Sequence, residues 1–323
     1  MRRVLIINRG VNTDNFGDEA INFCLKKLLA DQNCAVDSAN YTVFFEKERG
    51  KWRSLIGNFK KVVSLVKRNR YDLVVFGGGQ LIQSNQRFPL SFFIWIIILK
   101  LFSKSKIKTF GIGIDEKFSA TKKMLFKFGF SYIDEFYVRD IKSQANLKNV
   151  FNKKACITPD VVFTMPDFYT PNMIEQQYIL FGITTYRSIK RYKYVDGSEE
   201  DYLEEQAQLL LSFGNEYEIK IIYNTKEDYK YSIKLKGFIK SKYGIDVIIV
   251  QISNLFEYVD IVSSARNIMS SRMHALIIGL SYGVDIKPFI RNEKLKGFEQ
   301  FIRDFNEKGY TASVKEGIKK LIA

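Results

Sequence analysis

The stretch RVLIINRGVNTDNFGDEAINFCLKKLLAD (residues 3–31) decides the fold class of this chain. Residues 3–8 form a short apolar run, which is typical of a buried strand. Residues 18–31 carry apolar side chains at helical spacing, and two acidic residues open that segment, where the helix dipole favours negative charge. A buried strand followed by an amphipathic helix begins a βαβ unit, so the stretch predicts a parallel sheet covered by helices.

The same alternation of apolar runs and amphipathic stretches continues to residue 271. Beyond 3–31, the predicted strands are 71–79, 106–114, 134–140, 155–163, 178–185, 217–224, 245–252 and 266–271, and the predicted helices are 141–149, 201–213 and 255–265. Strands that alternate with helices in this way form parallel βαβ units. We therefore expect an α/β fold with two doubly wound, Rossmann-like domains that face each other across a cleft.

Prolines mark the expected boundary between these domains. Three of the five prolines lie between residues 159 and 171, and proline cannot continue a helix. The length of 323 residues also exceeds the usual size of a single core. We predict a linker at 164–172 between an N-terminal domain of residues 1–165 and a C-terminal domain of residues 172–323, whose last helix packs back on the N-terminal domain.

The charge of the chain favours anionic partners. Lys and Arg number 50 against 35 Asp and Glu, and the resulting net charge of +15 suits nucleic acid, an anionic membrane or a phosphorylated substrate. Residues 187–194 (RSIKRYKY) interleave basic and aromatic side chains, but no RNA-binding motif accompanies them, so we expect no nucleic-acid partner. We interpret this segment as a mobile basic loop near a phosphorylated or lipid-linked substrate.

The strongest apolar run, LSFFIWIIILKLF (90–102), is too short to span a bilayer and contains Lys100. It is either a buried helix or an apolar helix that touches a membrane surface. The start of the chain lacks the long apolar region and cleavage site of a signal peptide. Three cysteines without CxxC spacing and a single histidine offer neither a disulfide framework nor a metal cluster. We expect a cytoplasmic protein that works at the inner face of the membrane, with 90–102 and 187–194 as candidate contacts.

Ligands of open α/β sheets bind beyond the carboxyl ends of the strands, and four segments fall there. The first, residues 8–20, holds Asp18 and Glu19 at a predicted helix start, where these carboxylates either cap the helix or accept hydrogen bonds from substrate hydroxyls. The second, FGGGQLIQSN (76–85), has three glycines after a strand, which let the backbone approach a ligand closely. Ile82 stands where the GxGxxG fingerprint needs its third glycine, so no nicotinamide cofactor is expected.

The other two segments offer arginines. Arg139 follows a predicted strand directly and forms either a surface ion pair or a bidentate site for a carboxylate or phosphate. In SSRMHALIIG, Arg272 stands two residues before His274, the only histidine of the chain. Residues i and i+2 face the same side only on an extended chain, so we expect both side chains to lie in the loop before a predicted helix at 275–283 (ALIIGLSYG) and to converge on one anion. Ser270 and Ser271 would hold this turn; the alternative is a structural histidine.

Taken in this order, the four segments resemble the motifs of the polysaccharide pyruvyl transferase family. Here they read NFGDEAI, GGGQLIQ, VRDIKS and SSRMHALI, and the resemblance spans residues 3 to about 290. The resemblance implies a GT-B-like fold and the transfer of pyruvate from phosphoenolpyruvate to a pair of sugar hydroxyls as a ketal. It also implies a place in the biosynthesis of cell-surface polysaccharide, with a lipid-linked glycan as acceptor, phosphoenolpyruvate as co-substrate and no cofactor.

The resemblance assigns residues to roles. The family's phosphoenolpyruvate-binding arginines and histidine match Arg139, Arg272 and His274, and its acidic motif matches Asp18 and Glu19. In the implied reaction His274 protonates the methylene carbon of the enol and Asp18 accepts a hydroxyl proton, so these two are the expected catalytic residues. The other expected substrate-binding residues are Asn15, Gly78, Gly79 and Ser271.

Two other functions fit the same residues. A GT-B glycosyltransferase would bind a nucleotide sugar in this cleft, and a non-catalytic protein of the same fold would bind a glycan or another anion without releasing phosphate. The segment GIGIDEK (111–117) departs from the family pattern, because relatives more often have small or apolar residues at its acidic positions.

Overall fold

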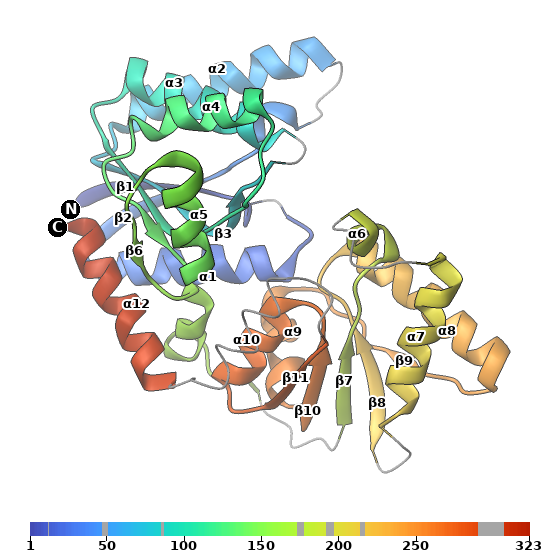
Figure 1. Cartoon of the computed structure of the whole chain (residues 1–323). Helices are drawn as coiled ribbons and strands as arrows, with labels where there is room; N and C mark the ends of the chain where they lie inside the picture. The colour runs from blue at the N-terminus through green and yellow to red at the C-terminus, as the bar shows by residue number, and fades with distance from the viewer. Residues whose placement is uncertain are drawn as a thin grey trace. The chain divides into compact units, whose positions relative to one another are not determined.

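A computed structural model describes residues 1–11, 13–46, 51–84, 87–172, 178–191, 197–213, 217–289 and 307–323 (Figure 1). The chain forms two compact units. The first unit comprises Met1–Thr13, Asp18–Val161 and Lys308–Ala323, and the second comprises Asp14–Gly17 and Val162–Glu307. Each unit contains one parallel sheet with helices packed on it, so the predicted α/β class with two doubly wound sheets is confirmed.

The sheet of the first unit has six parallel strands in the order β2-β1-β3-β4-β5-β6. These strands are β1 (Arg2–Asn8), β2 (Cys34–Asn40), β3 (Leu73–Ile82), β4 (Lys106–Ile114), β5 (Tyr137–Val138) and β6 (Cys156–Ile157). The chain runs from β1 outward to β2 and then crosses back to β3 on the other side of β1. The strand order therefore reverses between β1 and β3, and the crevice at their carboxyl ends is the topological switch point of this sheet.

Helices cover both faces of this sheet. They are α1 (Phe16–Ala30), η1 (Val43–Phe45, a 3-10 helix), α2 (Lys51–Asn69), α3 (Phe88–Phe102), α4 (Ala120–Phe130), α5 (Ile141–Phe151) and α12 (Glu307–Ile322). Figure 1 shows α2, α3 and α4 together on one face of the sheet, and α1 and α12 on the other. The C-terminal helix belongs to this unit because it packs on its core: a Cβ added to Gly317 would lie 2.9 Å from Thr158 Oγ1 and 3.2 Å from the Phe110 ring.

Helix α3 contains the strongest apolar run of the chain, and it is a core helix. Phe92 and Trp95 are fully buried, and Trp95 Nε1 donates a hydrogen bond of 3.0 Å to the carbonyl oxygen of Tyr41. The interpretation of this run as a buried helix is therefore supported. Within the described part of the chain, no helix combines the length and the apolar character needed to cross a bilayer.

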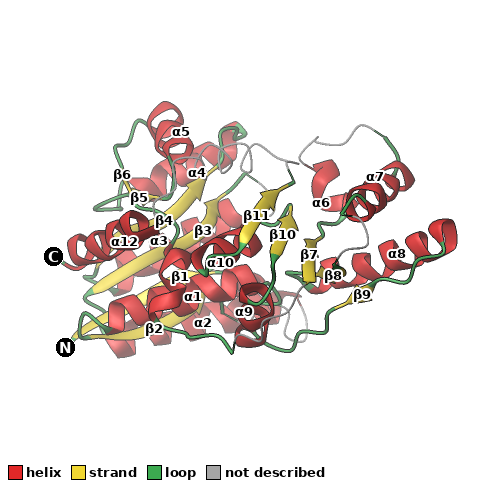
Figure 2. Ribbon diagram, turned by 90° about the horizontal axis from the view of Figure 1, so that it is seen from below, coloured by secondary structure: helices red, strands yellow, loops and turns green. Residues whose placement is uncertain are grey.

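The sheet of the second unit has five parallel strands in the order β11-β10-β7-β8-β9 (Figure 2). The strands are β7 (Tyr178–Gly182), β8 (Glu218–Ile222), β9 (Ile248–Ile249), β10 (Asn267–Ser270) and β11 (Asp285–Pro288). The helices are η2 (Val161–Asp167, a 3-10 helix), α6 (Tyr186–Arg191), α7 (Glu199–Leu211), α8 (Lys226–Tyr243), α9 (Leu255–Ser263) and α10 (Met273–Ser281). The strand order reverses between β7 and β10, so the switch point of this sheet lies where these two strands end.

Several local predictions need correction. The predicted strand 155–163 is a strand only at Cys156–Ile157, and a 3-10 helix follows at Val161–Asp167. This 3-10 helix contains Pro166 and buries Thr164 and Met165 completely, so half of the predicted linker at 164–172 is packed structure.

The structure also differs from the predicted basic loop at residues 187–194. Its residues 187–191 belong to helix α6, while 192–194 lie outside the described residues.

Candidate active site

The switch point of the first unit is built by the glycines after β1 and within β3. Gly78 and Gly79 have positive φ angles of 73° and 71°, which non-glycine residues rarely adopt. A Cβ added to Gly78 would lie 1.9 Å from Ile21 Cγ2, and one added to Gly79 would lie 3.7 Å from Asp18 Oδ1. Glycine at these positions therefore lets helix α1 pack closely on β3, and the predicted approach of the backbone to a ligand stays a prediction.

The two acidic residues of the NFGDEA motif lie in the first turn of α1. The carboxylate of Asp18 is 13% exposed, and its Oδ2 lies 3.8 Å from Arg9 Nε. Burial raises the pKa of the Glu19 carboxyl above its ordinary value. Asn15 Oδ1 accepts a hydrogen bond of 3.0 Å from the amide of Gly17, so Asn15 provides the side-chain cap that opens the helix.

Arg139 follows β5 directly, and its side chain is largely enclosed. The side chain is 6% exposed, with Nε 3.2 Å from Asp140 Oδ2 and Nη2 donating a hydrogen bond of 2.7 Å to Gln80 Oε1. Gln80 Nε2 in turn donates to Asp115 Oδ1 at 2.8 Å. Asp115, an acidic residue of the unusual GIGIDEK segment, thus holds Gln80 against Arg139. A Cβ on Gly113 would lie 2.2 Å from Gln80 Oε1 and 3.0 Å from Arg139 Cζ, so the pairing of Gln80 with Arg139 needs glycine at that position.

The switch point of the second unit is formed by the ends of β7 and β10. Ser270 Oγ donates to the carbonyl oxygen of Gly182 at 3.3 Å and accepts the amide of Arg272 at 2.9 Å. Ser271 Oγ and Thr184 Oγ1 are 2.6 Å apart. The two serines therefore hold this turn, as the sequence predicted.

The position of His274 differs from the prediction. Helix α10 begins at Met273, with Arg272 at its N-cap in an extended conformation. His274 consequently lies in the first helical turn, whereas the sequence predicted both residues in a loop before the helix. Because Ser270 Oγ accepts the amide of Arg272, the turn is complete at Arg272, and the helix begins at Met273, two residues before its predicted start at Ala275.

Arg272 is held by an acidic residue that the sequence did not reveal as functional. Its Nη2 hydrogen-bonds to Oδ1 of Asp228, which is fully buried, while the Arg272 side chain is 25% exposed. In the described residues, Asp228 Oδ2 and Arg272 Nε are buried without a hydrogen-bond partner. Asp228 lies in the first turn of α8 after the cap Thr225, so its local pattern predicts only a helix start. Its pairing with Arg272 is visible only in the structure.

Four residues of the NFGDEA region are part of the second unit. The amide of Phe16 donates a hydrogen bond of 3.0 Å to the carbonyl oxygen of Asn224, which follows β8. The Phe16 ring stacks on Tyr258 with 5.0 Å between centroids and 22° between planes. The following residue, Gly17, lies against His274, since a Cβ on Gly17 would come within 2.4 Å of His274 Nδ1. Phe16 is a positioning residue that the sequence analysis missed.

This contact brings two of the four motifs together. Gly17 touches the imidazole of His274, and the next residue of the chain is Asp18. Within the second unit, the imidazole of His274 and the guanidinium of Arg272 therefore lie near the start of α10, with Gly17 of the NFGDEA motif against the imidazole. Among the residues described by the structure, no cluster of three metal-ligating side chains occurs.

Solved structures with the same architecture are UDP-GlcNAc 2-epimerases. The enzyme from Methanocaldococcus jannaschii has a TM-score of 0.60 at 11% identity, over 100% of this chain and 99% of that chain. The enzyme from Neisseria meningitidis, bound to UDP-GlcNAc, has a TM-score of 0.59 at 11% identity, over 100% of both chains. The enzyme from Rickettsia bellii has a TM-score of 0.58 at 14% identity, over 100% of this chain and 96% of that chain. At these identities the similarity shows the fold alone, and the predicted GT-B-like class is confirmed.

Sequence comparison places the chain in a family. No curated protein matches it. The family profile described as polysaccharide pyruvyl transferase, however, matches residues 15–285, a range that includes the NFGDEA, GGG, VRD and SSRMH segments. The chain therefore belongs to the polysaccharide pyruvyl transferase family.

Proposed function

We propose that this protein transfers the pyruvyl group of phosphoenolpyruvate to a pair of sugar hydroxyls as a cyclic ketal, in the biosynthesis of a cell-surface polysaccharide. Membership of the family supports a transferase of this class. The observation that carries the proposal is the group of residues around the start of α10, where Arg272 lies on a buried carboxylate and His274 lies against Gly17 of the NFGDEA motif.

Arg272 is the proposed main ligand of phosphoenolpyruvate. Its guanidinium is orientated by the buried Asp228 and remains 25% exposed, and it stands at the N-terminus of α10, where the helix dipole also favours an anion. Arg139 is the proposed second anion ligand. Because its side chain is 6% exposed and bonded to Gln80 and Asp140, only part of its guanidinium is available in this conformation.

The proposed chemistry uses His274 as acid and Asp18 as base. His274 protonates the methylene carbon, which becomes the methyl group of the ketal, while a sugar hydroxyl forms a bond to the central carbon and gives its proton to Asp18. The carbon–oxygen bond to phosphate then breaks, and the second hydroxyl closes the ring on the same carbon. Of the two hydroxyl protons, one replaces the proton that His274 gave to carbon and the other leaves with phosphate, so the reaction needs no redox cofactor.

Phosphate release from phosphoenolpyruvate, measured against a panel of lipid-linked glycans, tests this proposal. We expect release only with the correct acceptor, and thermal stabilisation of the protein by phosphoenolpyruvate. A protein that is stabilised by UDP-GlcNAc instead would be a nucleotide-sugar enzyme. Binding of phosphoenolpyruvate without phosphate release in the presence of any acceptor would indicate a non-catalytic protein of this fold.

Two conservative variants test the assigned residues. His274→Gln keeps the size of the side chain but cannot supply the proton, and Arg272→Lys keeps a positive charge beside Asp228 but loses the planar guanidinium. Because general acid catalysis contributes about 10²–10⁴-fold, we expect a loss of at least about a hundredfold in phosphate release for His274→Gln. Arg266→Lys, an exposed arginine of the same unit, is the matched control and is expected to behave as the wild type. Folded His274→Gln and Arg272→Lys proteins with normal activity would refute the proposal.

Because Arg272 is paired with Asp228, we expect Arg272→Ala to lower the stability of the protein as well as its activity. Removing the guanidinium leaves a fully buried carboxylate without its charge partner, which costs about 3–5 kcal/mol of the free energy of unfolding. The double variant Arg272→Ala/Asp228→Asn removes that buried charge, so we expect it to regain stability in thermal melts while remaining inactive. A double variant that is stable but inactive would show that Arg272 acts on the substrate in addition to stabilising the fold.

A further inference from the structure

The outer helical layer of the first unit is strongly basic. Helix α2 contains six basic residues, α3 one and α4 three, and none of the three helices contains an acidic residue. These helices lie side by side on one face of the sheet (Figure 1), and we call their solvent-exposed side the α2–α4 face. The described basic side chains exposed on it include Lys60, Lys67, Arg68, Lys100, Lys123 and Lys127.

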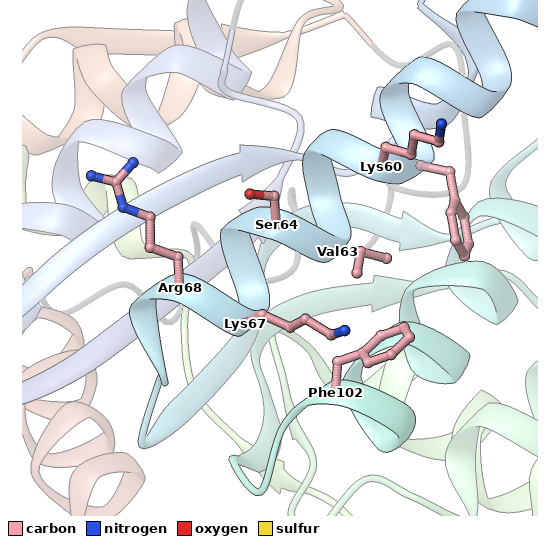
Figure 3. A pocket seen from close by; sticks show the side chains of 7 residues that line it. Lys60, Val63, Ser64, Lys67, Arg68 and Phe102 are labelled. Carbon is pink, nitrogen blue, oxygen red and sulfur yellow. The ribbon is translucent and has the colours of Figure 1, made fainter.

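A pocket opens in this face between α2 and the end of α3. It has a volume of about 530 Å³ and is lined by Phe59, Lys60, Val63, Ser64, Lys67, Arg68 and Phe102. Figure 3 shows the Lys67 side chain lying along Phe102, and its Nζ is 4.4 Å from the centroid of that ring. The pocket therefore combines cationic groups with an aromatic wall, which suits a phosphate group that is attached to an apolar body.

The basic side chains of this pocket differ in their ion pairing from the lysines of the second unit. On and around α8, lysines are neutralised by acidic residues in the pairs Lys234–Glu199, Lys236–Asp246 and Lys242–Glu204. In the described residues, by contrast, Lys60, Lys67 and Arg68 have no ion pair with a carboxylate. These three positive charges are thus not paired with a carboxylate of the described residues, which makes this part of the face complementary to a negatively charged surface.

The same face exposes large apolar side chains. Of the thirteen exposed large apolar residues in the described part of the chain, six belong to these three helices: Ile56, Phe59, Leu90, Leu101, Met124 and Phe128. The side chains of Leu101 and Met124 are 68% and 63% exposed. Aliphatic groups contribute nothing to the binding of free phosphate or of a nucleic-acid backbone, whereas they enter the boundary between headgroups and acyl chains of a bilayer.

We propose that the α2–α4 face docks the protein on the surface of an anionic lipid bilayer. Lipid phosphates bind Lys60, Lys67 and Arg68, and the exposed apolar side chains insert beneath the headgroups. Docking then overlaps only in part with the two segments that the sequence suggested. The run 90–102 contributes only its exposed residues, because its other face is core, and residues 187–194 are not needed.

The pocket lies at the edge of the sheet opposite to the candidate site of this unit. Helix α2 ends at Asn69, shortly before β3 begins at Leu73, and α3 ends at Phe102, shortly before β4 begins at Lys106. The pocket is therefore near the amino ends of these strands, whereas Asp18 and Gly79 lie at the carboxyl ends. Variants of the pocket are consequently expected to leave the chemistry with soluble substrates unchanged.

Co-sedimentation of the full chain with vesicles tests the proposal. We expect binding to vesicles of phosphatidylcholine mixed with phosphatidylglycerol at low salt, and little binding to phosphatidylcholine alone. High salt should weaken the binding, because screening shortens the reach of the surface charges. The variant K60Q/K67Q/R68Q removes the three cations with a residue that suits a helix. At about fivefold per basic residue, we expect its affinity for the mixed vesicles to fall by about a hundredfold.

A matched control separates this face from total charge. The variant K230Q/K240Q/K319Q loses the same net charge from exposed positions on α8 and α12, and we expect it to bind nearly as the wild type does. The variant L101S/M124S tests the apolar part, and we expect it to lower the binding that persists in high salt. All three variants should retain the thermal stability of the wild type.

Four results would overturn the proposal. They are no binding to the mixed vesicles at low salt, equal binding to phosphatidylcholine alone, equal losses in the two charge variants, and no effect of L101S/M124S. The alternative ligand of this face is a nucleic acid, and fluorescence anisotropy with a single-stranded oligonucleotide tests for its binding. If K60Q/K67Q/R68Q loses oligonucleotide binding and keeps vesicle binding, the α2–α4 face is a nucleic-acid site instead.

Discussion

The contact between Gly17 and His274 shows how one missing side chain shapes the candidate site. Gly17 has no Cβ, so the imidazole of His274 occupies the space where that atom would be. Phe16 holds the segment in place from the preceding position, through its amide bond to Asn224 and its stacking on Tyr258. The glycine of the NFGDEA motif is therefore explained by close packing on the histidine, without any appeal to an unusual backbone angle.

Gly17→Ala is expected to displace the imidazole of His274. The added methyl group would lie 2.4 Å from Nδ1, so the ring must move by several tenths of an ångström or more. Because a misplacement near 1 Å costs about a hundredfold in rate, we expect phosphate release to fall by about 10–100-fold. Gly237→Ala, at a helical glycine with open space around it, is the control and should stabilise the protein by about 0.5–1 kcal/mol. Normal activity of Gly17→Ala would show that His274 does not act from this position.

Helix α3 shows how an apolar segment is divided between core and surface. Pro89 stands in its first turn, where the missing amide hydrogen is no loss. Phe92 packs edge-on against Phe76 at 5.1 Å and Phe130 at 5.5 Å, and it is fully buried. Leu101, on the other side of the helix, is 68% exposed. The composition of the run indicates burial, and only the packing of neighbouring helices decides which side chains remain in solvent.

Two substitutions in α3 compare the contributions of a buried and an exposed side chain to the free energy of unfolding. Phe92→Ala removes a buried ring, and we expect it to lower the free energy of unfolding by about 3–5 kcal/mol. Leu101→Ala removes an exposed side chain, and the expected change is within about 0.5 kcal/mol. Urea unfolding followed by tryptophan fluorescence compares the two, since Trp95 lies in the same helix. Equal destabilisation by both changes would mean that the helix buries a different face.

At the scale of the whole molecule, the chain passes between the units more than once. Residues 14–17 group with the second unit although they lie between segments of the first, and residues 308–323 return to the first unit from the end of the chain. Helix α12 completes the core there, with Val314, Ile318 and Leu321 buried. The first unit therefore depends on a segment that follows the second unit in the sequence.

Neighbouring positions in α12 test that dependence. Ile318 is 1% exposed, while Lys319 is exposed. We expect Ile318→Asp to destabilise the protein by several kcal/mol, because it places an unpaired charge in the core, and Lys319→Asp to change the stability by about 0.5 kcal/mol or less. Differential scanning calorimetry of the two variants gives the comparison. If Ile318→Asp melts like Lys319→Asp, the C-terminal helix does not hold the first unit together.

Local patterns in the sequence were sufficient for the fold class and for the position of the motifs. Strand β4 was predicted with its observed bounds, and β1 and α1 within two residues at each end, because apolar periodicity and helix-start signals depend on neighbouring residues only. The rule that ligands bind at the carboxyl ends of parallel strands then placed Asp18, Arg139 and Arg272 at strand ends, where the structure has them.

Partnerships between distant segments were decided by the tertiary structure alone. Asp228 and Arg272 are 44 residues apart, and their pairing follows from β8 and β10 lying on either side of β7. The enclosure of Arg139 by Gln80, and the approach of Gly17 to His274, likewise depend on which strands become neighbours and where a segment docks. Strand order and docking result from the burial of many side chains at once, so no local pattern of the sequence encodes them.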